Sequence, residues 1–308
     1  MLHLILYFFL ILNTQALENY ELSYKVAILK PKQKFQSLKL WLPLPKKTHE
    51  QETEIINIHS PVAYHLGRDK KYNNSSLFFD LSDVKKFPIF IEVKSNIIRK
   101  VAKFSRLYKA SPKIEWLPKK FLNSNRLIPS SKILSNRAHQ ASIKHQSQFE
   151  LIKSLYLNVV SKMKYSKHGQ GWGNGDALWA CQSQYGNCTD FHSVLIGMAR
   201  SKNIPARFEI GLPIPSSKKG LIKGYHCWAR LYDVKRGWIP VDASESYKTG
   251  VHLRYFGKLP ADRIHFSTGR DLILDPPQES EPLNYFIYPY LEIDGVSSNH
   301  YKKEFKLN

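Results

Sequence analysis

One cysteine stands between a glycine–asparagine turn and an apolar run in the stretch YGNCTDFHSVL, where it is Cys188. Because Gly186 and Asn187 tolerate turn conformations and asparagine can cap a helix, we expect Cys188 in the first turn of a helix. Unpaired backbone N–H groups and the helix dipole there favour a thiolate and could bind an oxyanion. Asp190 would support the helix dipole but oppose a thiolate, so we expect it to point away from Cys188. A merely packed cysteine is the alternative, because free cysteine is among the most buried residue types.

A histidine and an aspartate lie in two strand-like runs, GYHCWARLYD and GWIPVDAS, which flank the turn-rich stretch DVKRG. A hairpin folded about Val234 places His226 directly opposite Asp242, with their Cβ atoms about 4.5–5.5 Å apart. Asp242 could then accept from one imidazole nitrogen and leave the other for a thiol, as in a Cys-His-Asp triad. A slip by one residue would turn Asp242 to the other face, so the prediction depends on the register. Strand alternation points Cys227 away from the face of His226, which argues against Cys227 as the nucleophile.

Two alternatives use the same residues differently. His192 lies four residues after Cys188 and could be the base, or a hydrogen-bonded core histidine. A side chain on the same helix is poorly aimed at a thiol in the preceding turn, which favours His226. A zinc site could recruit Cys181, Cys188, His192, His226 and Cys227, but these lack the closely spaced pairs typical of structural zinc sites. We therefore expect no metal ion.

The chain has three cysteines, Cys181, Cys188 and Cys227. In an oxidising compartment an odd number leaves at least one thiol unpaired, unless it pairs between chains. A bridge between Cys181 and Cys227 with Cys188 free would satisfy that count.

The elements around this constellation divide the chain into three parts. Runs such as YELSYKVAI and FPIFIEVKS alternate apolar and polar residues and are separated by proline and polar clusters, which predicts a small antiparallel β domain over residues 17–103. Residues 104–131 have the composition of a connecting segment. Residues 132–308 combine a helix with one buried face at 149–163, the helix after Cys188, and several strands that include the run LNYFIYPYLEIDG.

The N-terminus has the pattern of a secretory signal peptide. An apolar run from Leu4 to Leu12, too short to span a bilayer, precedes the small-residue site Thr14-Gln15-Ala16, which predicts cleavage after residue 16. The protein is then exported to the periplasm, the cell envelope or the medium. A buried strand or an uncleaved anchor is the alternative, because no lysine or arginine precedes the run.

The chain is strongly basic, with 46 Lys and Arg against 25 Asp and Glu and a net charge of +21. These residues are spread along the chain and no nucleic-acid-binding motif accompanies them, so we expect no nucleic-acid partner. In an exported protein such a charge favours attraction to an anionic envelope polymer, although a generally basic proteome would give the same value.

The stretches GNCTDFHSVLIGMARSKNIPARFEIGLP, GYHCWARLY and GWIPVDAS, in this order, resemble the core of the transglutaminase-like superfamily in its bacterial branch. The resemblance is specific over residues 172–246 and looser towards the C-terminus, and the N-terminal β domain is similar to one that precedes this core in some bacterial members. It implies a papain-like α+β core, in which a helix bearing Cys188 packs on an antiparallel sheet bearing His226 and Asp242. It also implies that Cys188 is the nucleophile, His226 the general base and acid, and Asp242 the orienting acid.

The resemblance further implies a reaction. Such enzymes form a thioester with a glutamine-type amide of a protein or peptide and pass the acyl group to an amine or to water. A peptidase or amidase acting on envelope peptides, and a binding protein that keeps the fold without turnover, are the alternatives. Trp172, Trp179 and Trp228 could line the acyl site, or could be ordinary core aromatics. No cofactor is expected, and the lack of an acidic cluster of calcium-loop type predicts calcium independence.

Overall fold

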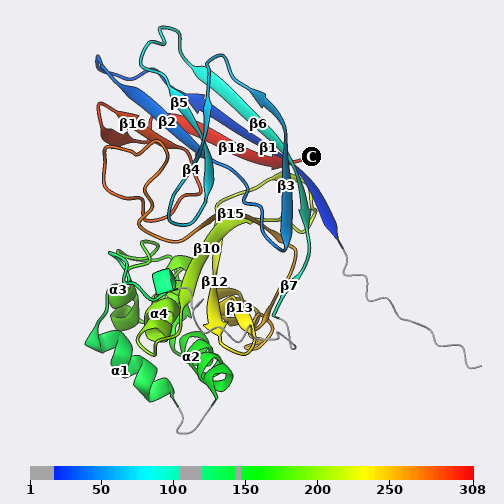
Figure 1. The fold of residues 1–308 in the computed structure, drawn as a ribbon, viewed down its shortest axis with the longest axis vertical. Coiled ribbons are helices and arrows are strands. Elements are labelled where there is room, and N and C mark those ends of the chain that lie inside the picture. The colour runs from blue at the N-terminus through cyan, green and yellow to red at the C-terminus, as the bar shows by residue number, and fades with distance from the viewer. Residues whose placement is uncertain (1–16, 105–118, 143–146) are drawn as a thin grey trace, which may run out of the picture.

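The computed structural model describes residues 17–104, 119–142 and 147–308, and the expected signal peptide, residues 1–16, lies outside them. Two antiparallel sheets occupy one end of the molecule, and a helical core built against a third sheet occupies the other (Figure 1). The α+β class expected from the sequence is confirmed. Across the described ranges no helix is both long enough and apolar enough to cross a membrane.

The first sheet orders its strands β11-β18-β1-β6-β3. Their bounds are β11 Gly220–Leu221, β18 Tyr301–Leu307, β1 Glu18–Ile28, β6 Ile89–Arg99 and β3 Gln51–His59. Strand β1 buries Leu22, Tyr24 and Val26 and exposes Glu21 and Lys25. This is the period of two that predicted a strand, because successive side chains point to opposite faces of a sheet.

The second sheet orders its strands β17-β16-β2-β5-β4. Their bounds are β17 Val296–Ser298, β16 Tyr290–Ile293, β2 Leu38–Pro43, β5 Ser75–Asp80 and β4 His65–Arg68. Leu40, Leu42 and Phe79 of this sheet belong to the same buried cluster as the inward side chains of β1. The two sheets therefore share one apolar core, as in a sandwich.

The segment after the helical core returns to these two sheets. Strand β18 pairs antiparallel with β1, with Tyr301 opposite Ile28, and β16 pairs with β2, with Tyr290 opposite Trp41. Residues 290–307 were expected within the catalytic domain, yet their strands complete the sheets that the first hundred residues begin.

The core sheet orders its strands β13-β12-β10-β15, all antiparallel. Their bounds are β13 Gly237–Val241, β12 His226–Asp233, β10 Ala206–Pro213 and β15 Arg263–Thr268. The α-helices in the described residues are α1 Lys132–Ala141, α2 Gln148–Lys162, α3 Ala177–Ser183, α4 Cys188–Arg200 and α5 Ala243–Thr249. Short pairs complete the core: β14 Lys258–Leu259 with β7 Ala102–Lys103, and β8 Lys164–Tyr165 with β9 Tyr185–Gly186.

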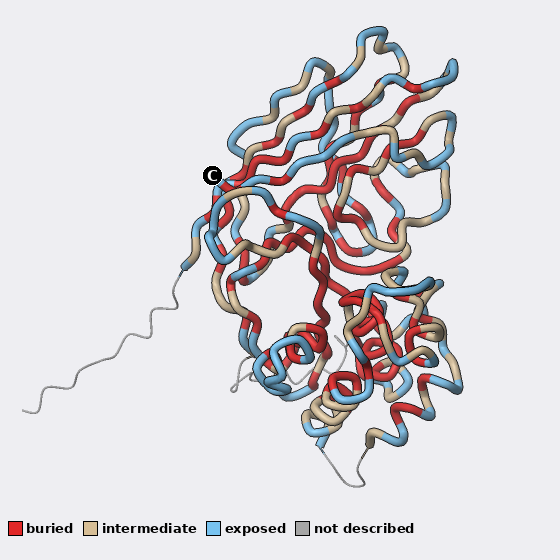
Figure 2. The backbone as a smooth tube through the Cα atoms, turned by 180° about the vertical axis from the view of Figure 1, so that it is seen from behind, coloured by how far each residue is buried: buried red, intermediate tan, exposed pale blue. Residues whose placement is uncertain are grey.

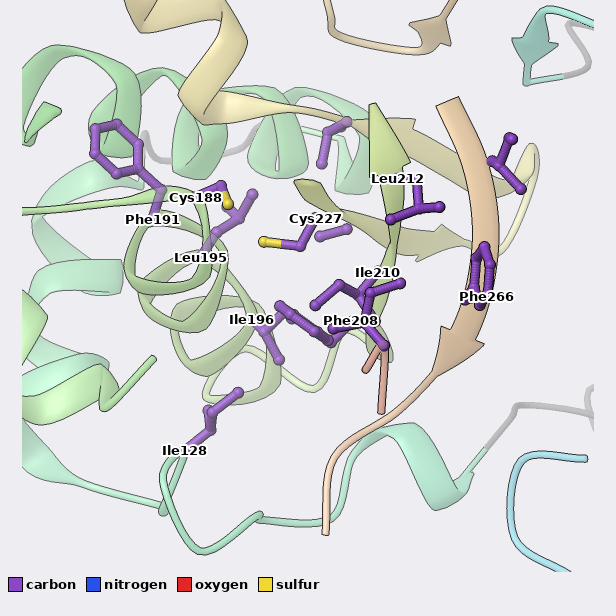
Figure 3. Packing of buried hydrophobic residues seen from close by; sticks show 14 of the residues in the cluster. Ile128, Cys188, Phe191, Leu195, Ile196, Phe208, Ile210, Leu212, Cys227 and Phe266 are labelled. Carbon is purple, nitrogen blue, oxygen red and sulfur yellow. The ribbon is translucent and has the colours of Figure 1, made fainter. Parts of the chain in front are cut away.

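Helix α4 is the centre of this core, and its residues from Cys188 to Ala199 are all buried (Figure 2). It packs against α1, α2 and α3 on one side and against β10 and β12 on the other. Leu195 and Ile196 face the sheet residues Phe208 and Ile210 (Figure 3). A helix buried all round is held in place by every neighbour, so its first residue has a defined position.

Buried polar contacts join the sandwich to the core sheet. Arg230 of β12 lies 3.0 Å from Glu209 Oε2 on β10 and 3.0 Å from Glu50 Oε1, which precedes β3. Gln51 Nε2 of β3 donates to the carbonyl of His265 in β15 at 2.8 Å. These contacts fix the sandwich relative to the strands that carry the site.

Candidate active site

Helix α4 begins at Cys188, as the sequence predicted, and a capping box holds its N-terminus. Asn187 Oδ1 accepts from the backbone N–H of Thr189 at 2.8 Å, and Asp190 Oδ2 accepts from the backbone N–H of Asn187 at 2.8 Å. Gly186 has φ +153°, and a Cβ there would collide with the Asp190 carboxylate. The glycine is required because the capping carboxylate passes so close to the backbone.

Asp190 also organises the glycine-rich loop that precedes α3. Its carboxylate accepts from the backbone N–H of Gly173 at 2.7 Å and of Gly175 at 2.9 Å. Thr189 Oγ1 donates to the carbonyl of Gly173 at 3.0 Å. Burial raises the pKa of Asp190, and the three backbone N–H groups oppose that rise. The carboxylate is thus directed at the loop backbone.

His226 is the first residue of β12, and Asp242 is the N-cap of α5 directly after β13. His226 Nε2 lies 2.6 Å from Asp242 Oδ2, and both side chains are buried. The contact was expected, but the register that suggested it was wrong. The hairpin pairs Ala229 with Val241, so the position opposite Asp242 is that of Trp228, two residues from His226. A slip of two residues keeps both side chains on one face, so the pair still meets as diagonal neighbours.

The Asp242 carboxylate is surrounded by donors. Arg263 Nη1 lies 2.8 Å from Oδ2, the oxygen that His226 also binds. Ser244 Oγ donates to Oδ1 at 2.9 Å, and the backbone N–H of Glu245 donates to it at 3.0 Å. Burial alone would raise the pKa of Asp242, but the charges of His226 and Arg263 hold it well below its usual range. Asp242 is therefore a fixed anion.

Because Asp242 engages Nε2 of His226, the other ring nitrogen is left for Cys188, with which His226 forms a hydrogen bond. Burial favours neutral forms of both groups. A hydrogen bond from Cys227 and the charge of His226 nevertheless hold the pKa of Cys188 well below its usual value. Asp242 overcomes the burial of His226 and raises its pKa to about 9. The site thus favours a thiolate beside an imidazolium.

His192 makes a complete set of contacts elsewhere. Its Nδ1–H donates to the carbonyl of Cys188 at 2.7 Å, and its Nε2 accepts from the backbone N–H of Ala243 at 3.2 Å. These partners fix one neutral tautomer. Burial lowers the pKa of His192, in agreement with a neutral ring. His192 therefore joins α4 to the start of α5, as in the core-histidine alternative.

A family model of the transglutaminase-like superfamily matches residues 136–243. The matched segment runs from α1 to the residue after Asp242 and contains both Cys188 and His226. The chain therefore carries a transglutaminase-like core. The resemblance stated from the sequence is confirmed over this segment.

Two comparisons extend over nearly the whole chain. An uncharacterized protein of Haemophilus influenzae is 25% identical over 96% of this chain and 91% of its own length. The crystal structure of a proposed cysteine protease from Cytophaga hutchinsonii superposes with a TM-score of 0.59 at 14% identity, covering 95% of this chain and 93% of the other. That likeness extends the shared fold to the sandwich. The periplasmic domain of TgpA from Pseudomonas aeruginosa matches more weakly, with a TM-score of 0.41 at 13% identity over 76% of this chain and 93% of the other.

All three cysteines are described and all are free, buried thiols, so the bridge considered between Cys181 and Cys227 is not present. Cys181 lies in α3, with its sulfur 3.7 Å from Arg137 Nη1. Cys227 lies instead beside Cys188 and hydrogen-bonds to it. In the described part of the chain, no group of three or more His, Cys, Asp or Glu residues is arranged to hold a metal ion.

The three tryptophans differ in their surroundings. Trp228 is fully buried beside the ring of His226, and its Nε1 donates to Glu209 at 2.6 Å, so it is a core aromatic of the transglutaminase-like core. Trp179 is half-buried, packs edge-on against Tyr185, and lies against Gly171 of the glycine-rich loop. Trp172 is half-buried in that loop, next to the Gly173 that Asp190 and Thr189 hold. Trp172 and Trp179 remain candidates for lining the acyl site.

The sequence did not indicate a group of four tyrosines near Cys188. Burial raises the pKa of each of them, and the charge of Cys188 adds to that rise. They are Tyr165, Tyr225, Tyr285 and Tyr288. The Tyr225 hydroxyl accepts from Asn187 Nδ2 at 3.2 Å, and Lys303 of β18 lies 4.0 Å from the Tyr288 ring centre. The sandwich thus reaches the aromatic wall of the site.

The stretch RIHFSTGRD, residues 263–271, supplies three anchors for the site. Arg263 binds Asp242, as described above. Arg270 donates to Ser193 Oγ on α4 at 2.9 Å and to the carbonyls of Asn174 and Gly175 at 3.2 Å. Asp271 accepts from Asn125 Nδ2 at 3.0 Å. Two isolated arginines in a strand-like run carry no local signal for such contacts.

Proposed function

We propose that this protein is a cysteine enzyme that cleaves amide bonds through a thioester on Cys188 and transfers the acyl group to an amine or to water. The observation that carries the proposal is the His226–Asp242 contact of 2.6 Å, with the second ring nitrogen turned to a thiol at the start of a buried helix. A binding protein would have no need of a carboxylate, an imidazole and a thiol in this order.

In the first half-reaction the Cys188 thiolate attacks the carbonyl carbon of a glutamine-type amide. The oxyanion forms near the N-terminus of α4, where the backbone N–H groups and the helix dipole stabilise negative charge. His226 gives its proton to the departing nitrogen, so ammonia leaves and the thioester remains with a neutral imidazole.

In the second half-reaction His226 acts as the base. It takes a proton from an amine or a water molecule that attacks the thioester carbonyl, and the Cys188 thiolate leaves beside the regenerated imidazolium. Asp242 does not need to accept a proton, because His226, Arg263 and Ser244 stabilise its anionic form. Its role is to orient the ring and to stabilise the imidazolium.

A peptidase or amidase that uses only water is the second candidate. The superposition on a proposed cysteine protease over nearly the full chain favours considering it. The two candidates share both half-reactions up to the acceptor, so the same residues serve either one.

The deciding experiment supplies a glutamine-containing donor protein and a fluorescent primary amine. Amine incorporation supports transfer, and ammonia release without incorporation supports hydrolysis. Cys188→Ala should abolish both, whereas Cys181→Ala, which removes a thiol outside the site, should leave both unchanged. Turnover that survives in Cys188→Ala would refute the cysteine mechanism.

We further propose that the enzyme is exported and that its positive charge attracts an anionic envelope polymer near its substrates. The apolar run before Ala16 and the net charge of +21 support this proposal. Sequencing the N-terminus of the mature protein from fractionated cells tests export. Loss of envelope binding at raised salt would support the polymer, because screening weakens interactions between exposed charges.

A further inference from the structure

Acyl transfer uses one thiol, yet two lie together in the site. Strand β12 alternates its side chains, so Cys227 points away from the face of His226 and towards α4. Its sulfur lies 3.6 Å from His192 Nδ1, and the same nitrogen donates to the carbonyl of Cys188. Figure 3 shows the sulfur atoms of Cys188 and Cys227 turned towards each other across the interface between the helix and the sheet.

In the proposed reaction Cys227 forms no bond to the substrate, and its part is limited to a hydrogen bond that favours the Cys188 thiolate. The residue is fully buried and packs within the same apolar cluster as Leu195 and Ile210. The carbonyl of Cys188 already receives the His192 proton, so Cys227 is not needed to satisfy the helix backbone. What its sulfur contacts is the sulfur of the proposed nucleophile.

We propose that Cys188 and Cys227 are a reversible redox pair, in which an internal disulfide masks the nucleophile under oxidising conditions. The oxidant is a peroxide, which is small enough to reach a thiolate that is 3% exposed. The disulfide would occupy the sulfur that must attack the substrate, so the oxidised protein is inactive and the reduced protein is active.

The chemistry balances with hydrogen peroxide as the two-electron oxidant. The Cys188 thiolate attacks one peroxide oxygen, the O–O bond breaks, and hydroxide leaves, which makes a sulfenic acid on Cys188. The Cys227 thiol then attacks the sulfenic sulfur, the S–O bond breaks, and its proton leaves with the oxygen as water. A dithiol reductant reverses the step by exchange, becoming oxidised as it restores both thiols.

The order of events follows from the surroundings of the two sulfurs. Cys188 is the sulfur stabilised as a thiolate, by the hydrogen bond from Cys227 and by His226, so it meets the oxidant first. Cys227 lies in contact with it and resolves the sulfenic acid before a second peroxide arrives. The sulfurs must close to about 2.0 Å for the bond, and side-chain rotation from an existing hydrogen-bond contact is the direct way to do so.

The test measures thiols and not turnover, so it stands or fails separately from the acyl-transfer proposal. The folded protein is treated with hydrogen peroxide, quenched in acid, denatured and alkylated, and digested with trypsin. Cys181 and Cys188 share the tryptic peptide 168–200, whereas Cys227 lies in the peptide 224–230. We expect these two peptides to be linked and two hydrogen atoms lighter than their sum, and dithiothreitol to separate them. When dithiothreitol is added instead to the oxidised native protein, it should restore iodoacetamide labelling of Cys188.

Three variants assign the bond. Cys181→Ser must keep the link, because the proposal gives Cys181 no part in it. Cys227→Ser must lose the link, and its Cys188 should advance to sulfinic acid that dithiothreitol does not reverse. Cys227→Ala serves the same purpose if the serine variant does not fold. The proposal is overturned if wild-type Cys188 becomes sulfinic acid while Cys227 remains alkylatable, or if the link disappears in Cys181→Ser.

Discussion

The Cys188–His226 pair has its pKa values shifted in opposite directions, and this sets a pH window. The pKa of Cys188 is lowered, so the thiolate is present above that lowered value, and the pKa of His226 is raised to about 9, so the imidazolium persists below it. Both charged forms therefore coexist at neutral pH. The carboxylates near His226 are those of Asp242 and Glu245, and Glu245 Oε1 lies 3.9 Å from His226 Nε2. The nearby His192 is neutral.

We predict that iodoacetamide labels Cys188 rapidly below pH 7, where an ordinary thiol with a pKa of about 8.5 reacts slowly. Amide cleavage should decline above pH 9, because His226 then lacks the proton that the leaving nitrogen needs. Mass spectrometry of the labelled protein over a pH series measures the first effect, with Cys181 as the internal reference. Labelling of Cys188 that rises only above pH 8 would contradict the ion pair.

Arg263 shares the Asp242 carboxylate with His226 and repels its protonated ring. We predict that Arg263→Gln moves the midpoint of Cys188 labelling to higher pH, by about one unit, because removal of a positive charge favours every protonated form nearby. Arg263→Lys, which keeps the charge, should move it less. Labelling over the same pH series is the measurement.

The control is Arg200→Gln, which removes a half-buried arginine that binds Asn125 and the carbonyl of Ala206 away from the site. It should leave the midpoint unchanged. A lower rate in Arg263→Gln at every pH, with an unmoved midpoint, would show that Arg263 acts only as a packing residue.

The sequence could predict the His226–Asp242 contact because both residues lie on one hairpin, where alternation of side chains decides which residues share a face of the sheet. The predicted register was incorrect, but the error was two residues, so both side chains still lie on one face and the contact forms. Arg263, Tyr285 and Lys303 could not be found in the same way. They come from strands and loops far along the chain, and no local spacing links them to Cys188.

At the scale of elements, the capping box decides where α4 begins and hence where the thiol stands. Asn187 is buried, and its side chain accepts a hydrogen bond from the backbone N–H of Thr189 and donates one to the Tyr225 hydroxyl. We predict that Asn187→Ala lowers the free energy of unfolding by about 1–2 kcal/mol, the upper part of the range for helix caps. Urea denaturation measures the loss, and labelling of Cys188 should slow as the helix start loosens.

Ser131 provides the matched control, because it caps α1 through the backbone N–H of Ile133 at an exposed position. Ser131→Ala should cost about 0.5–1 kcal/mol and leave Cys188 labelling unchanged. Equal effects of both variants on labelling would mean that the α4 cap has no special part in the site.

Helix α4 itself was predictable, since its apolar spacing and its Gly-Asn start are local signals. The anchors of the glycine-rich loop on Asp190 and Arg270 were not predictable, because a carboxylate in a first helical turn usually supports only the dipole.

At the scale of the whole molecule, Arg230 between Glu50 and Glu209 holds the sandwich against the core sheet. We predict that Arg230→Gln lowers the free energy of unfolding by about 3–5 kcal/mol, because it leaves the buried Glu50 without its cation and Glu209 with Arg207 alone. Thermal and urea denaturation measure this cost. Lys47→Gln is the control: it breaks the exposed pair with Glu52 and should cost less than about 1 kcal/mol. A small effect of Arg230→Gln would mean that this ion pair does not hold the two parts together.

The order of the chain carries a further consequence for biosynthesis. The first strand, β1, lies between β6 and β18, and β18 follows every residue of the core in the chain. While the polypeptide is still being made, Tyr24 therefore lacks Phe305, the ring stacked on it at 4.2 Å in the finished protein. Lys303, which lies over the Tyr288 ring, arrives with the same strand. Cys188, His226 and Asp242 are all synthesised before either contact can be made, so the aromatic wall is completed only after the residues of the reactive centre have been synthesised.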